Sequence, residues 1–158
     1  MIKYCEFRNV CCLEICNSSV TIKYNKFIES SGIDLYLNSS PSIEYNTFDN
    51  SAGMSNVYAI SSSPINVREP TVSPIISYNN IANYYQGICL LWSNNATISN
   101  NNITNCEFYA IGYGGVISNN YIANCKGLSV VDTTGEQCDG TTYQNPQTMP
   151  VPEAGCGW

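Results

Sequence analysis

The chain has 158 residues, 11% of them charged, and its net charge is −6. Its six basic residues form no cluster or stripe, so the composition does not fit a nucleic-acid partner. No apolar run reaches the roughly 18 residues of a membrane span, and no secretory signal opens the sequence, which we attribute to a missing N-terminal segment.

Six copies of a short motif follow in chain order, each opened by an aliphatic residue and carrying a second apolar residue five places later. They read I-K-Y-C-E-F, I-K-Y-N-K-F, I-E-Y-N-T-F, I-S-Y-N-N-I, I-S-N-N-N-I and I-S-N-N-Y-I, and they begin at Ile2, Ile22, Ile43, Ile76, Ile98 and Ile117. Fixed columns at intervals of 20, 21, 33, 22 and 19 residues predict stacked units. The long interval holds an insertion, which we place as a loop around residues 61–74.

Each copy is expected to form two or three short strands. A segment of alternating character follows the motif, as in Ile33-Asp34-Leu35, which sends the outer two residues inward and the middle one outward. Stacked copies would lie roughly 4.8 Å apart. The core is therefore predicted to contain the six openers in one column and, in a second column, Phe7, Phe27, Phe48, Ile81, Ile103 and Ile122.

The residue three places after the opener is Asn in every copy but the first. Asn suits the left-handed backbone of a corner and hydrogen-bonds nearby main chain. When the same Asn recurs one layer further on, its amide can donate to the next amide and satisfy polar groups that the corner would otherwise bury. We therefore predict a structural asparagine ladder of Asn25, Asn46, Asn79, Asn101 and Asn120.

The pattern I-x-x-N-x-I-x-N followed by G-I-x-L, iterated about every 20 residues, resembles the repeat of pectate-lyase-like proteins. Among these it is most similar to the carbohydrate-binding and sugar-hydrolase repeats of the NosD-type family. The resemblance implies an all-β fold, a right-handed single-stranded parallel β-helix (β-solenoid) of about six turns. We assign residues 1–131 to this β-helix. Residues 132–158 show no further copy and are expected to form an irregular tail or cap that contains Cys and Pro.

Nine cysteines leave at least one unpaired within the chain. Cys106 and Cys125 take the same place in neighbouring turns, about one strand spacing apart, which fits either a disulfide or a ladder of two thiols. Cys138 and Cys156 bracket the tail and are the stronger disulfide candidates. No metal site is predicted, because the chain has no His and no C-x-x-C pair occurs among the four thiols of the first turn, which are Cys5, Cys11, Cys12 and Cys16.

The weak catalytic candidates lie in the outward column of the last strand of each turn. We expect this column to contain Glu14, Asp34, Ala59, Cys89, Gly112 and Ser129. Glu14 and Asp34 would lie about 5 Å apart, which suits the two carboxylates of a retaining glycosidase. The catalytic Asp cluster and Arg of the resembled lyases have no counterpart, and an outward acid on such a coil is normally only solvated. No cofactor is expected, and Ca²⁺ enters only if the chain is part of a lyase.

A sugar-binding site is expected beside the insertion. Arg68 lies at the centre of the insertion, and Tyr84, Tyr85 and Trp92 follow it at corner or outward positions. Aromatic faces beside a polar loop form a surface on which a sugar ring can stack. The alternative is that Tyr84 and Tyr85 only cover a corner of the coil.

These observations favour an exported β-helix scaffold, structural or carbohydrate-associated, in an extracellular, cell-surface or periplasmic location. The alternative is a fragment of a polysaccharide lyase or glycoside hydrolase that acts on extracellular glycans. We also expect the chain to associate with itself through its coil ends, as a dimer or a filament, because the strand edges of the first turn are open. The predicted partners are thus a second copy and a polysaccharide, with no nucleic acid and no membrane span.

Overall fold

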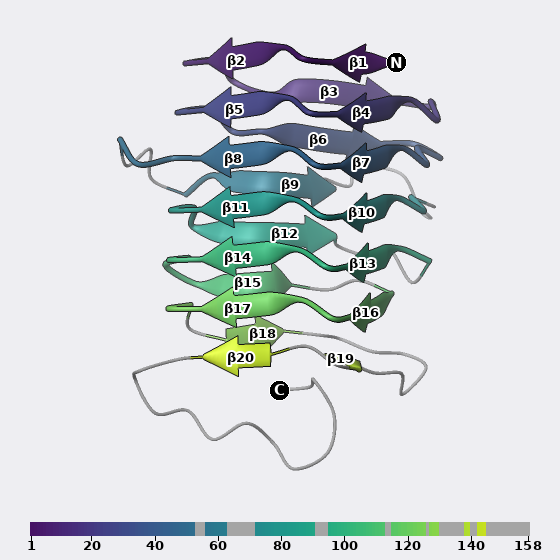
Figure 1. Cartoon of the computed structure of the whole chain (residues 1–158). Helices are drawn as coiled ribbons and strands as arrows, with labels where there is room; N and C mark the ends of the chain where they lie inside the picture. The colour runs from purple at the N-terminus through teal and green to yellow at the C-terminus, as the bar shows by residue number, and fades with distance from the viewer. Residues whose placement is uncertain are drawn as a thin grey trace.

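The computed structural model is a coil whose turns are stacked along one axis, so that strands of successive turns pair into three parallel sheets (Figure 1). It describes residues 1–52, 56–62, 72–90, 95–112, 115–125, 127–129, 138–139 and 142–144, the last three ranges by their backbone alone. Each of the six predicted turns supplies one strand to each sheet, and strands of successive turns pair in parallel. The parallel β-helix that the repeat predicts is confirmed.

We name the sheets A, B and C in the order in which each turn enters them. Sheet A contains β1 (Ile2–Lys3), β4 (Thr21–Lys23), β7 (Ser42–Glu44), β10 (Ile75–Ser77), β13 (Thr97–Ser99), β16 (Val116–Ser118) and β19 (Cys138–Asp139). Sheet B contains β2 (Glu6–Arg8), β5 (Lys26–Ile28), β8 (Thr47–Asp49), β11 (Asn80–Ala82), β14 (Asn102–Thr104), β17 (Tyr121–Ala123) and β20 (Thr142–Gln144). Sheet C contains β3 (Leu13–Cys16), β6 (Ile33–Tyr36), β9 (Tyr58–Ser62), β12 (Gln86–Leu90), β15 (Tyr109–Gly112) and β18 (Gly127–Ser129).

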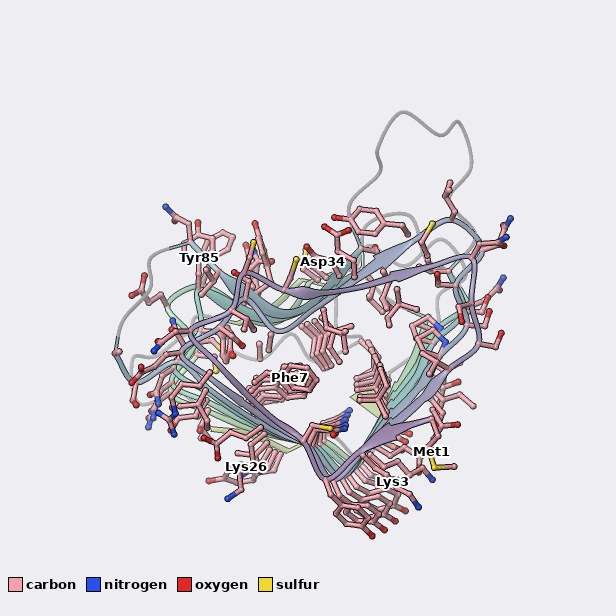
Figure 2. All side chains as sticks on the ribbon, turned by 90° about the horizontal axis from the view of Figure 1, so that it is seen from above. Met1, Lys3, Phe7, Lys26, Asp34 and Tyr85 are labelled. Atoms are coloured by element: carbon pink, nitrogen blue, oxygen red, sulfur yellow. The ribbon has the colours of Figure 1, made fainter. Side chains whose placement is uncertain are left out.

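Columns of like residues, one from each turn, fill the interior. The six isoleucine openers are register partners along sheet A, and from Ile22 to Ile117 they are at most 1% exposed. Along sheet B the rings of Phe7, Phe27 and Phe48 stack with centroids 4.7 and 4.6 Å apart. Figure 2 looks down this interior and shows Phe7 inside it. Because each turn buries its apolar residues against the next, stability depends on contacts between neighbouring turns.

The corner between sheets A and B, which we call the first corner, contains the asparagine ladder. Each ladder residue from Asn25 to Asn101 donates its backbone N–H and its Nδ2 to the Oδ1 of the Asn in the next turn, at 2.9–3.0 Å. Nδ2 also donates to the carbonyl of the opener in the preceding turn, for example from Asn79 to Ile43 at 2.9 Å. All five asparagines are at most 2% exposed. The ladder therefore satisfies polar groups that the tight corner removes from water.

Two short strands lie in the segment that we expected to be irregular. β19 continues sheet A, with Cys138 opposite Ile117, and β20 continues sheet B, with Tyr143 opposite Ile122. The strand pairing thus extends beyond residue 131, and the expectation that no further copy follows must be corrected. Cys138 and Tyr143 keep the five-residue spacing of the motif but replace its aliphatic residues, which hides the copy in the sequence. Residues 145–158, with Cys156, lie outside the described residues.

The expected insertion joins β9 of sheet C to β10 of sheet A. Its central residues 63–71, including Arg68, lie outside the described part of the chain, and so does Trp92. These two predicted sugar contacts therefore stay predictions. Within the ranges given above, no helix is both long and apolar enough to span a membrane.

Candidate functional site

The outer face of sheet C carries the polar side chains that we expected to bear chemistry. The register of β3, β6, β9, β12 and β15 aligns these residues into one column that runs along the coil. In order from the first turn, the column consists of Glu14, Asp34, Ser61, Cys89 and Gly112. The two carboxylates are therefore neighbours, as the spacing predicts.

The prediction of Ala59 in this column is wrong, and Ser61 takes its place. Ile60 lies opposite Ile33 and Ser61 lies opposite Asp34. Ala59 is therefore two residues before the position that belongs to the column, and it is completely buried. A Cβ built on Gly32 would come within 2.0 Å of the Ala59 carbonyl oxygen, which shows how closely the two turns approach there. The sequence shows only small and apolar residues at this point, and a register shifted by two residues keeps the same alternation of inward and outward positions.

The carboxylate of Asp34 is surrounded by hydrogen-bond donors. The Ser61 hydroxyl donates to its Oδ1, and the Tyr36 hydroxyl lies 3.5 Å from its Oδ2. The thiol of Cys12 approaches Glu14 at 3.9 Å. Burial and the neighbouring Asp34 raise the pKa of Tyr36 to about 12, and the same two causes raise the pKa of the Cys12 thiol to about 12. At neutral pH these two groups therefore stay protonated and act as donors, not as a base or a nucleophile.

The charges needed for lyase chemistry are not assembled around this pair in the described part of the chain. The two salt bridges found there, Arg8 with Glu6 and Lys23 with Glu44, lie on sheets A and B. No group of three His, Cys, Asp or Glu that suits a metal ion occurs among the described residues. What the acidic pair offers chemically is a polar surface whose carboxylates already have donors.

An aromatic cluster lies beside the column at the end of sheet C where each strand begins. Tyr85 and Phe108 stack with centroids 5.6 Å apart, Tyr58 meets Tyr85 edge-on at 6.3 Å, and Phe108 tilts against Tyr109 at 4.0 Å. All four side chains are half-buried. Figure 2 shows Tyr85 and Asp34 on the outer side of sheet C. Tyr85, which the sequence suggested as a sugar contact, is thus part of a larger aromatic surface.

Tyr84 is wrong as a surface contact. It lies at the corner between sheets B and C, which we call the second corner, and it is 0% exposed. Its hydroxyl donates to the carbonyl of Ser30 at 3.0 Å, and burial raises its pKa. The alternative that Tyr84 belongs to the corner is therefore the one that the structure shows, although it fills the corner from inside instead of covering it.

Next to the aromatic cluster, Gln86 carries a buried acceptor without a partner. The residue is 8% exposed, and its Oε1 makes no hydrogen bond. A Cβ placed on Gly112 would lie 3.3 Å from this Oε1 and 3.9 Å from the Sγ of Cys89, so the Gln86 side chain lies over the glycine and leaves little room for a methyl group. An unpaired buried acceptor costs about 1–3 kcal/mol. Sequence reasoning missed Gln86, because a single Gln at the start of a strand carries no signal of its burial.

The groups around Oε1 of Gln86 are neutral. Burial raises the pKa of the Cys89 thiol to about 11. Burial and the nearby Cys89 and Tyr85 raise the pKa of Tyr58. A thiol, phenols, aromatic faces and one unpaired acceptor together favour an uncharged polyol over an ion, because an ion would find no counter-charge in this surface.

Cys106 and Cys125 lie at the second corner and form no disulfide with each other. The backbone N–H of Cys106 donates to the Sγ of Cys125 at 3.3 Å, so the pair has the thiol-ladder arrangement, one of the two that the sequence left open. The hydrogen bond with Cys125, together with burial, raises the pKa of the Cys106 thiol. A bond between Cys138 and Cys156 falls outside the described side chains and stays a prediction.

The family model for the right handed beta helix region matches residues 11–148 of the chain. No curated protein and no solved structure matches it. The match agrees with the three parallel sheets and extends over the segment that contains β19 and β20. The finer resemblance to NosD-type repeats stays a prediction.

Proposed function

The chain belongs to the right-handed β-helix family, and we propose that it acts as a non-catalytic scaffold that binds a neutral sugar unit on the outer face of sheet C. The observation that carries this proposal is the unpaired Oε1 of Gln86, which lies over Gly112 beside the aromatic cluster. A sugar hydroxyl would donate to Oε1 once the Gln86 side chain turns outward, and this bond would remove the cost of the unpaired acceptor. The apolar face of the ring would pack against the aromatic cluster of Tyr58, Tyr85, Phe108 and Tyr109.

Two substitutions separate binding from folding. Gln86→Met removes the unpaired acceptor, so it should raise the free energy of unfolding by about 1 kcal/mol while it abolishes sugar binding. Gly112→Ala places a methyl group 3.3 Å from Oε1, so it should displace the Gln86 side chain and also prevent binding. Asn102→Ala, on the exposed face of sheet B, is the matched control and should bind as the wild type does.

The test is an array of neutral oligosaccharides followed by calorimetric titration of the best binder. Binding that survives in both Gln86→Met and Gly112→Ala would contradict this site. No signal above background at high protein concentration would contradict sugar binding altogether.

A second candidate function is cleavage of glycans by hydrolysis or by elimination, which is favoured by the register that sets Glu14 opposite Asp34. Against it, Asp34 already accepts from Ser61 and Tyr36, and the protonated Tyr36 and Cys12 supply no base. We therefore expect polygalacturonate, alginate and xylan to stay intact, with or without Ca²⁺. Reducing ends or unsaturated products that the wild type forms and Asp34→Asn does not would establish catalysis instead.

Export to the cell surface or periplasm and self-association through the coil ends also belong to this proposal. Self-association would add strands of a second copy to the end of the coil that contains β1, β2 and β3, by pairing of strand edges. Light scattering at about the concentrations used for calorimetry measures the assembly, and a strictly monomeric particle would contradict it. Fractionation of the source cells tests the location.

A further inference from the structure

Two consecutive cysteines lie just before β3, with their thiols in contact. Cys11 is exposed, Cys12 is half-buried, and the two form no disulfide with each other. The thiol of Cys12 makes a hydrogen bond with that of Cys11, and it also approaches Oε1 of Glu14 at 3.9 Å. Because Glu14 belongs to the outward column of sheet C, the pair lies on the outer face of the coil. We call Cys11 and Cys12 the vicinal dithiol.

The second turn fixes the backbone on both sides of the dithiol. The carbonyl of Cys11 accepts from the N–H of Ser31 at 2.9 Å, and the N–H of Leu13 donates to the carbonyl of Gly32 at 2.8 Å. The register of β3 and β6 places Gly32 beside Cys12, and a glycine adds no side chain there. The second turn therefore holds the two cysteines in place, and its nearest residue has no side chain that could cover the thiols.

Carboxylates beside the dithiol keep it protonated. Burial, the charge of Asp34 and the hydrogen bond with Cys11 raise the pKa of the Cys12 thiol to about 12. The two salt bridges found among the described residues involve neither Glu14 nor Asp34, so the negative charge beside the thiols is not cancelled by an ion pair there. A protonated thiol attacks a disulfide slowly, because the thiolate is the reactive form. The surroundings therefore slow the oxidation of this pair by thiol–disulfide exchange.

A disulfide between the two cysteines would also be strained. Consecutive Cα atoms are about 3.8 Å apart, whereas a disulfide usually joins Cα atoms about 4.4–6.8 Å apart. Strain of this kind makes a disulfide easy to reduce. An atom that bonds to both sulfurs closes a larger ring and avoids the strain. The dithiol is therefore better suited to hold such an atom than to form a disulfide.

No third thiol is near the pair within the described residues. Cys16, at the other end of β3, is four residues from Cys12, which corresponds to roughly 13 Å along a strand. Cys5 lies at the first corner, between β1 and β2. No group of three His, Cys, Asp or Glu that suits a metal ion occurs in the described ranges. The dithiol thus fits a thiophilic atom that needs only two sulfurs from the protein, not a tetrathiolate zinc ion.

We propose that the vicinal dithiol binds a trivalent arsenic compound such as arsenite, with both sulfurs bonded to one arsenic atom. Arsenite is uncharged at neutral pH, so the carboxylates do not repel it. Cys11 would displace one hydroxide, which leaves as water with the proton of the thiol. Cys12 would then displace a second hydroxide on the arsenic that Cys11 already holds, and Glu14 or Asp34 would pass the thiol proton to it. One arsenite and two thiols thus give a dithioarsenite and two molecules of water, and arsenic stays trivalent.

A thiophilic metal cation fits the dithiol less well. A cation must displace both thiol protons, so the raised pKa of Cys12 lowers its affinity at neutral pH. A two-coordinate cation with metal–sulfur bonds of about 2.3 Å in line would also place the sulfurs about 4.6 Å apart, farther than two hydrogen-bonded thiols. The affinity for arsenite should therefore stay constant between about pH 6 and about pH 8, whereas the affinity for Cd²⁺ should rise with pH. A rise for arsenite as steep as that for Cd²⁺ would contradict binding to neutral thiols.

The probe is phenylarsine oxide, added to the reduced full chain and followed by intact mass spectrometry under native conditions. We expect one adduct per chain, which excess glutathione leaves in place and dithiothreitol removes, because the second sulfur recaptures the arsenic within the same site. Cys11→Ser and Cys12→Ser should each lower the affinity at least about hundredfold, since either variant leaves a single thiol. The matched controls, which should bind as the wild type does, are Cys5→Ser, Cys16→Ser and Cys138→Ser/Cys156→Ser.

Circular dichroism checks that each variant keeps the fold, and the proposed sugar site on sheet C plays no part in this test. A glutathione-resistant adduct that persists in Cys11→Ser or Cys12→Ser would overturn the proposal, and so would removal of the wild-type adduct by glutathione. If the wild type loses the mass of two hydrogens in air and Cys12→Ser does not, the pair forms a disulfide, and its assignment as a stable dithiol is overturned.

Discussion

The first and second corners of each turn solve the same problem in different ways. In the second, fourth, fifth and sixth turns, both corners turn the chain through a residue of positive φ, and both bury the residue that follows it. At the first corner this buried residue is Asn in five successive turns, and one hydrogen-bond pattern propagates through all of them. At the second corner it varies among Ser30, Tyr84, Cys106 and Cys125.

The first corner, which is the same from turn to turn, specifies the fold, whereas the second corner makes each turn different from its neighbours. A uniform column satisfies every layer by repetition, so a change in one layer affects the layers on both sides. At the second corner each turn finds its own partner, such as the Ser30 carbonyl for Tyr84 or the Cys125 sulfur for the Cys106 amide. Substitutions there should be felt locally and cost less.

The largest effect is expected in the core that both corners enclose. Ile98→Asp places a charge among fully buried side chains, which costs several kcal/mol and should unfold the domain. Ser99→Asp, one residue further on the outer face of sheet A, is the matched control and should change the free energy of unfolding by less than about 0.5 kcal/mol. Chemical denaturation measures both. Equal damage from the two substitutions would contradict the assignment of inward and outward residues.

Breaking the first corner should come next. Asn79→Ala removes the Oδ1 that accepts from the Asn46 backbone and side chain, and the Nδ2 that donates to Asn101 and Ile43. Several buried groups then lose their partner, at about 1–3 kcal/mol each, so we expect a loss of about 3–5 kcal/mol. The control is Asn102→Ala, whose exposed Nδ2 donates only to Asn80 on the surface of sheet B. If the two variants lost the same amount of stability, the ladder would not be a stabilising element.

The sequence predicts the uniform columns well, because each carries the same residue at the same place in several copies. The isoleucine openers and the pairing of Glu14 with Asp34 follow from that repetition alone. Errors arise where the copies differ. The small residues around Ala59 allow two registers, and Cys138 and Tyr143 replace the aliphatic residues by which the motif is identified.

The candidate sites were harder to predict than the coil. Whether Tyr84 or Tyr85 faces outward depends on the rotation of the chain just after the positive φ of Asn83, which no composition or period specifies. The vicinal dithiol is visible in the sequence as two consecutive cysteines, but the approach of Asp34 from the next turn follows only from the register of β3 and β6. The unpaired Gln86 depends on burial by neighbours from other turns.

Alkaline pH should lower the part of the stability that depends on the protonated Cys89 thiol. It should not change the part that depends on the asparagine ladder, which does not titrate. The pKa of the Cys89 thiol is raised from 9.0 to about 11 in the folded chain. Between these values the unfolded chain loses the proton and the folded chain keeps it, so stability is present below pH 9 and falls as pH rises to 11. The loss from this group is at most about 3 kcal/mol. Denaturation at a series of pH values measures it, and Cys89→Ala should remove most of the decline; an unchanged decline in that variant would contradict the burial of this thiol.

The smallest effect is expected at the second corner, where a substitution removes a single contact and leaves the contacts of the neighbouring turns in place. Tyr84→Phe keeps the ring in the core and deletes only the hydroxyl that donates to the buried Ser30 carbonyl, so we expect a loss of about 1 kcal/mol. Tyr85→Phe, on the half-buried outer surface, is the matched control and should change stability by less than about 0.5 kcal/mol. Thermal and chemical denaturation measure both variants. Tyr84→Phe should also reduce the loss of stability above about pH 10, because burial raises the pKa of this phenol in the folded chain. A loss as large as that of Asn79→Ala would mean that the second corner is also coupled from turn to turn, and the contrast between the two corners would not hold.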